Sequence, residues 1–80
     1  MTFDEFWSKV LQGGTAPMRR GGKINYSVIN ENNEEKLHIK STNSSNEFYF
    51  ITKEKAEEYF KDPKNPNHHW FNTVFENLNK

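Results

Sequence analysis

The 80-residue chain contains no cysteine, no long apolar run and no excess of either charge sign. Without cysteine there are no disulfides, thiolate zinc sites or iron–sulfur clusters. No apolar run approaches the roughly 18 residues that cross a bilayer, and acids stand near the N-terminus where a secretory signal would be positive. We expect one small domain over residues 1–80, cytoplasmic and not associated with a membrane.

Positive charge is unevenly distributed although the total is balanced. Eleven Lys and Arg residues match eleven Asp and Glu residues, whereas strong nucleic-acid binding needs surplus positive charge. Residues 9–30 nevertheless carry four basic side chains and no acidic one. If the partner is a nucleic acid, the sequence therefore predicts weak binding.

The first residues have the pattern of an amphipathic helix. Apolar side chains between Phe3 and Leu11 recur at the spacing of a 3.6-residue period. Thr2 and Glu5 have the spacing of a capping box, and Gly13-Gly14 is a typical helix stop. We predict a helix over 2–12.

Three later segments, 23–30, 36–40 and 47–51, alternate with period two and are separated by Asn-rich turns. They predict an antiparallel meander with one core face and one polar face. The side chains expected on the core face are Ile24, Tyr26, Val28, Leu37, Ile39, Phe48 and Phe50. Those expected on the polar face are Asn25, Ser27, Lys36, His38, Lys40 and Tyr49.

Two helices are predicted after the strands. Thr52 is a suitable N-cap for the first, which Asp62-Pro63 ends, and Asn67 is the expected cap of a second that continues to the chain end. The predicted fold is α+β: an N-terminal helix, a three-stranded antiparallel β-meander, then two C-terminal helices packed on one sheet face. The predicted core is Phe3, Phe6, Trp7, Val10, Ile24, Val28, Leu37, Ile39, Phe48, Phe50, Phe60, Phe71, Val74 and Phe75.

No catalytic or metal-binding motif is recognisable. The chain has no G-x-S-x-G elbow and no paired carboxylates within an apolar segment. His68 and His69 are neighbours and would point about 100° apart on a helix, unlike the i, i+4 pair of a zinc helix. We expect no enzymatic activity, no cofactor and no metal.

The segment 13–23 combines glycines at both ends with Arg19, Arg20 and Lys23. Backbone N–H groups and arginine side chains in such a loop suit an anion or a phosphate, but a solvated connector fits the same residues equally well. Both interpretations stay open. The candidate residues for nucleic-acid or anion binding are Arg19, Arg20, Lys23, Asn25, Lys36, His38 and Lys40.

The predicted order of helix, three strands and helix over residues 2–61 loosely resembles that of double-stranded RNA-binding domains, with Lys53 and Lys55 at the start of the later helix. The resemblance is topological, because the G-P-x-H loop of those domains is absent. Residues 23–61 also resemble in outline the arm-type DNA-binding domains of phage integrases. That resemblance implies a reading face of Asn25, Ser27, Lys36, His38 and Lys40.

The sequence leaves two functions open for a non-enzymatic binding module. One is weak association with nucleic acid through the basic loop and the polar sheet face. The other is interaction with a protein, as an inhibitor, immunity protein or regulatory subunit. A monomer and a homodimer both remain open, because small cores often gain stability by burying surface between chains.

Overall fold

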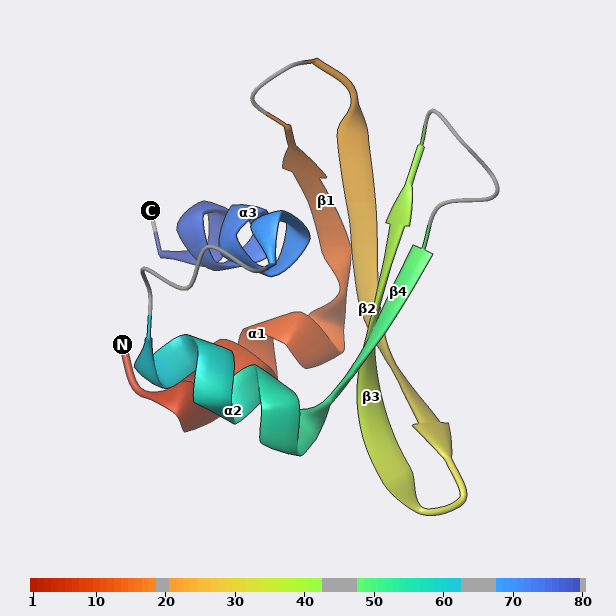
Figure 1. The fold of residues 1–80 in the computed structure, drawn as a ribbon, viewed down its shortest axis with the longest axis vertical. Coiled ribbons are helices and arrows are strands. Elements are labelled where there is room, and N and C mark those ends of the chain that lie inside the picture. Colours follow the sequence, from red (N-terminus) through yellow and green to blue (C-terminus); the bar gives the residue numbers. More distant parts are fainter. Residues whose placement is uncertain (19–20, 43–47, 63–67, 80) are drawn as a thin grey trace.

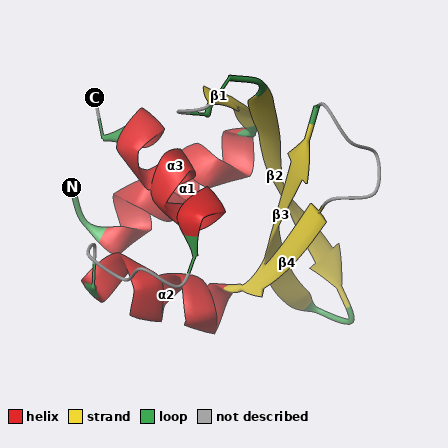
Figure 2. Cartoon of the chain, turned by 45° about the horizontal axis from the view of Figure 1, so that its top comes forward, coloured by secondary structure: helices red, strands yellow, loops and turns green. Residues whose placement is uncertain are grey.

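The computed structural model describes residues 1–18, 21–42, 48–62 and 68–79 and has two layers, with three helices on one side of a sheet (Figures 1 and 2). This confirms the predicted α+β class, although the sheet has four strands and not three. In chain order the elements are α1 (Phe3–Gln12), β1 (Gly14–Pro17), β2 (Lys23–Glu31), β3 (Glu34–Ser41), β4 (Phe48–Thr52), α2 (Lys53–Lys61) and α3 (His69–Leu78).

Helix α1 ends at the predicted residue and begins one residue later than predicted, with Thr2 as its N-cap. The Thr2 hydroxyl accepts a hydrogen bond from the Glu5 N–H at 3.2 Å. Asp4 and Glu5 lie in the first turn, where the helix dipole favours negative charge. Gly13 ends the helix with a φ of 73°, a conformation that glycine adopts without a Cβ clash.

The sheet is fully antiparallel, with spatial order β1-β2-β3-β4. Asn32 and Asn33 join β2 to β3 and both have positive φ, as a two-residue hairpin turn of the right twist requires. The turn predicted from the Asn-rich segment is therefore confirmed, and the strands around it extend further than predicted. The β2–β3 turn lies at one end of the sheet, and the last residues of β1 and β3 lie at the other, beside the first residues of β2 and β4 (Figure 1).

The fourth strand, β1, lies where the sequence predicts only a loop. Gly14–Pro17 pairs with β2, and the side chain of Ala16 is completely buried. The Met18 N–H donates to the Gly22 carbonyl oxygen, which closes the hairpin. The prediction of a three-stranded meander was therefore wrong, and the inserted strand also separates this topology from that of double-stranded RNA-binding domains.

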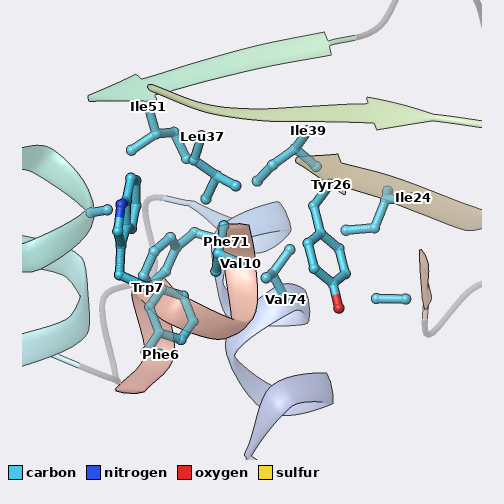
Figure 3. Packing of buried hydrophobic residues seen from close by; sticks show 12 residues of the cluster. Phe6, Trp7, Val10, Ile24, Tyr26, Leu37, Ile39, Ile51, Phe71 and Val74 are labelled. Carbon is cyan, nitrogen blue, oxygen red and sulfur yellow. The ribbon is translucent and has the colours of Figure 1, made fainter. Parts of the chain in front are cut away.

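The three helices lie side by side across one sheet face: α3 contacts β1, α1 contacts β2, and α2 contacts β3 and β4. Figure 3 shows the α1 and α3 side chains pointing toward those of the strands. The buried apolar residues are Phe6, Trp7, Val10, Ala16, Ile24, Tyr26, Leu37, Ile39, Ile51, Ala56, Phe71 and Val74. The predicted core residues Phe3, Val28, Phe60 and Phe75 are only partly buried, at the margin of this cluster.

The N–H group of the buried Trp7 ring has a hydrogen-bond partner at the edge of the core. Its Nε1–H donates to Glu35 Oε2 at 2.6 Å, and the Lys53 ammonium lies 5.8 Å from the centre of the ring. A hydrogen bond to a carboxylate is shorter and stronger than one between neutral groups. These contacts fix α1 against β3 and the start of α2.

The orientation predicted for β4 is inverted. Phe48 and Phe50 are each 50% exposed, whereas Ile51 is 4% exposed and Tyr49 lies on the helical side against Trp70. The pairing of Ile51 with the buried Leu37 sets this orientation. Because side chains alternate along a strand, burying Ile51 places Phe48 and Phe50 on the opposite face.

Helix α3 has a histidine as its N-cap, whereas the sequence favoured Asn67, which lies outside the described residues. His68 Nδ1 accepts a hydrogen bond from the Phe71 N–H at 3.3 Å. The imidazole also contacts the rings of Tyr49 and Tyr59, at centroid distances of 5.0 and 5.5 Å. It therefore connects the start of α3 to β4 and α2.

We expect the protein to lose stability as the pH falls below about 6.5, the ordinary pKa of histidine. Burial lowers the pKa of His68, a backbone hydrogen bond opposes it with a smaller effect, and the charge of His69 adds the smallest contribution, which again lowers the pKa. The unfolded chain therefore binds this proton more tightly than the folded chain. The stability is complete above the unfolded pKa and is lost as the pH falls through the folded one.

The measurement is urea unfolding between neutral and mildly acidic pH, with the variant His68→Asn as the control. Asparagine caps a helix without titrating in this range. The stability of the variant is therefore expected to fall less steeply than that of the wild type as the pH is lowered. An unchanged pH dependence in the variant would show that another group causes it.

Candidate functional site

The side of the sheet opposite the helices carries the candidate site, and we call it the outer face. Its residues follow from the strand register, since paired residues on neighbouring strands point to the same side. The helix-facing residues Leu37 and Ile39 are fully buried, which places the intervening residues of β3 outward. The outer face comprises Thr15, Pro17, Lys23, Asn25, Ser27, Ile29, Glu31, Glu34, Lys36, His38, Lys40, Phe48, Phe50 and Thr52.

The outer face brings together five of the seven candidate residues. Lys40 pairs with Asn25 on one side, and His38 pairs with Ser27. Lys36 lies two residues before His38 on β3, and Lys23 lies two residues before Asn25 on β2, so each lysine points to the same side as the residue that follows it. Arg19 and Arg20 lie outside the described residues, so their contribution stays a prediction. The outward positions predicted for the polar residues of β2 and β3 are confirmed, whereas Tyr49 of β4 lies on the helical side of the sheet.

The lysines of the outer face are available to a ligand. In the part of the chain that the structure describes, Lys23, Lys36 and Lys40 form no ion pair with a carboxylate. The acids Glu31 and Glu34 face each other at the β2–β3 turn, at the far end of the strands. Positive charge is consequently concentrated toward the end of the sheet where β1 and β2 connect.

Three rings form a cluster in the middle of this charge. The rings of His38 and Phe50 are stacked, with centroids 4.8 Å apart and an interplanar angle of 21°. Phe48 meets Phe50 edge to face at 5.4 Å and lies 6.0 Å from His38. Lys40 pairs with Phe48 across the strands. We call Phe48, Phe50 and His38 the aromatic cluster.

Hydrogen bonds hold the end of the sheet next to the cluster. The Thr15 hydroxyl bonds to Asn25 Oδ1 at 2.8 Å and fixes the position of that amide between β1 and β3. The Thr42 N–H and hydroxyl both donate to the Lys23 carbonyl oxygen, at 2.9 and 3.0 Å. The polar groups of the outer face thus stand on a fixed backbone.

The sequence reasoning missed Phe48 and Phe50 as outer-face residues. The signal was present, because four consecutive apolar side chains from Phe48 to Ile51 must place two on each side of a strand. With helices on only one side of the sheet, the two that point to the other side, Phe48 and Phe50, are left without a covering layer.

Two other kinds of site find no support in the described ranges. No three His, Asp or Glu side chains of that part of the chain gather as metal ligands. None of the helices described is both long and apolar enough to cross a membrane.

Comparison with protein-family models, with curated proteins and with solved structures finds no match to this chain.

Proposed function

We propose that this protein is a non-enzymatic cytoplasmic module that binds nucleic acid through the outer face. The observation that supports the proposal is the basic row along β3, where Lys36, His38 and Lys40 occupy every second position. Successive side chains of such a row are about 6.6 to 6.8 Å apart. Neither lysine is paired with a carboxylate in the described part of the chain. Both ammonium groups are therefore free to neutralise phosphates.

The charge of the chain determines how strong this binding is. With a net charge of zero, long-range attraction to nucleic acid is absent and only the local lysines contribute. We expect dissociation constants of roughly 10⁻⁴ to 10⁻⁶ M near physiological salt. Binding should weaken steeply as salt rises, because each phosphate contact releases a counterion.

Fluorescence anisotropy with labelled oligonucleotides at low salt tests the proposal. The double variant Lys36→Gln/Lys40→Gln is expected to weaken binding and to reduce the slope of log affinity against log salt by about 0.7 to 0.9 per lysine. The control Lys55→Gln/Lys61→Gln makes the same charge change on exposed positions of α2 and should keep the slope. Equal losses in the two variants would mean that binding follows net charge and not the outer face.

A protein partner is a second candidate function, and the exposed Phe48 and Phe50 favour it. Contiguous exposed apolar surface on a small protein often marks an interaction site. If the wild-type chain binds no nucleic acid at low salt, an inhibitor, immunity or regulatory role replaces the first proposal. A photocrosslinking amino acid in place of Phe50 would then identify the partner.

A further inference from the structure

We propose that the ligand of the outer face is single-stranded nucleic acid, whose unpaired bases stack on the aromatic cluster. This inference rests on the proposed function and adds the class of nucleic acid. It is carried by the rings of Phe48, Phe50 and His38, whereas the proposed function is carried by the lysines.

The exposure of two phenylalanines is costly for a protein of this size. Burying a phenylalanine side chain stabilises a fold, and this chain has only seven of them. Phe48 and Phe50 nevertheless remain half exposed. Their rings thus keep surface that a flat apolar ligand can cover.

The geometry of the cluster suits stacking of bases. His38 and Phe50 already lie as a stacked pair, and Phe48 packs edge-on against Phe50. The rings hold one another in place, which reduces the ordering entropy that a ligand must overcome. Every base has a flat π face, so stacking on such rings tolerates different base sequences.

Phosphate-binding groups lie next to the rings. Lys40 is the cross-strand partner of Phe48, and neighbouring strands are only about 4.8 Å apart. A base on Phe48 therefore brings its own backbone within reach of the Lys40 ammonium. Aromatic rings with basic side chains beside them are the combination used to bind single strands without sequence preference.

A duplex fits the same face poorly. Its bases are stacked on one another and paired, so their faces are not available to Phe48 or Phe50. Four strands at spacings of about 4.8 Å span about 14 Å between the axes of β1 and β4, whereas the major groove is about 12 Å wide. A sheet wider than the groove does not enter it, so a duplex is left with contacts to its phosphates.

The lysines also distinguish this ligand from a protein partner. The buried centre of a protein interface is depleted of charged residues. Here Lys40 and Lys36 flank His38 on both sides along β3, within the same face as the rings. A partner covering the rings must therefore supply negative charge next to flat apolar surface, as a nucleotide does.

The test compares single-stranded DNA and RNA with hairpin duplexes of equal length by fluorescence anisotropy at low salt. We expect the single strands to bind at least severalfold more tightly than the duplexes. Phe48→Leu and Phe50→Leu keep apolar volume but remove the ring. Each is expected to weaken single-strand binding by about 5- to 150-fold, the range for losing one base–aromatic stack. Phe50→Tyr keeps the ring and should retain binding.

Tyr49→Leu is the matched control, because Tyr49 lies between the two phenylalanines and is 48% exposed, but on the helical side of the same strand. It should leave binding unchanged, and thermal melting verifies that each variant is folded.

Equal binding of duplex and single strand, with Phe48→Leu and Phe50→Leu neutral, would overturn this inference and leave the proposed function standing. No binding of the wild-type chain to any of the probes would instead overturn the proposed function. A concentration-dependent dimer that Phe50→Leu dissociates would assign the rings to a second copy of the chain and overturn the inference.

Discussion

Replacing Phe6 with alanine is expected to lower the free energy of unfolding by about 3 to 5 kcal/mol, most of the stability of a protein this small. The Phe6 side chain is completely buried. Its ring centroid lies 5.5 Å from those of Phe60 and Phe71, 6.0 Å from that of Phe75 and 6.2 Å from that of Phe3. These rings come from all three helices. The cavity left by alanine would therefore weaken the packing of the three helices against one another.

The matched control is Phe50→Ala, the same substitution on the outer face. Phe50 is half exposed, and its described ring contacts are with His38 and Phe48. Cross-strand pairs of this kind contribute about 0.2 to 1 kcal/mol, so the expected loss is several times smaller than for Phe6. Urea unfolding followed by tryptophan fluorescence measures both variants.

Either variant can contradict the structure. An unchanged urea midpoint in Phe6→Ala would mean that Phe6 is not at the centre of the core. If Phe50→Ala lost as much unfolding free energy as Phe6→Ala, Phe50 would be a core residue. The strand β4 would then turn Phe48 and Phe50 toward the helices, as the sequence predicts. The pair thus tests the orientation of β4 as well as the core.

Helix α1 shows what can be predicted from the sequence. Its apolar spacing, the Thr2 cap and the Gly13 stop all indicate the same helix, and no other pattern competes with them. Strands β2 and β3 are nearly as clear, because their apolar and polar residues alternate except at Ile29. Their outward residues Asn25, Lys36, His38 and Lys40 were therefore placed correctly on one face.

The orientation of β4 could not be read in the same way. Phe48, Tyr49, Phe50 and Ile51 are all apolar or aromatic, so either alternation is compatible with a strand. Choosing the larger side chains for the core favoured the two phenylalanines. The long-range pairing of Ile51 with Leu37 decides otherwise, and this contact has no signal in the local sequence.

Strand β1 was missed because its residues have low strand propensity. Glycine, alanine and proline are depleted in strands, and the segment Gly14–Pro17 contains one of each. Pro17 has no backbone N–H to donate to a neighbouring strand, but β1 is an edge strand, where proline is tolerated. Pairing with β2 and the burial of Ala16 under α3 stabilise this strand, and both depend on the assembled fold.

Gly14 in β1 gives the second large prediction, because its missing Cβ makes room for a ring. Gly14 is the pairing partner of Tyr26, and a Cβ built on it would lie 2.8 Å from Tyr26 Oη and 3.0 Å from Cζ. Tyr26 is only 5% exposed, so its ring has little freedom to move away. Gly14→Ala is therefore expected to cost about 1 to 3 kcal/mol of unfolding free energy, the usual range for overpacking.

A double-mutant cycle with Tyr26→Phe separates this clash from a general intolerance of β1 to alanine. Phenylalanine removes Oη, the atom nearest to the added Cβ, and leaves the rest of the ring in place. The double variant should therefore lose less stability than the sum of the two single variants, by at least about 0.5 kcal/mol. Strict additivity would show that Tyr26 does not lie over Gly14, and would put the pairing of β1 with β2 in question.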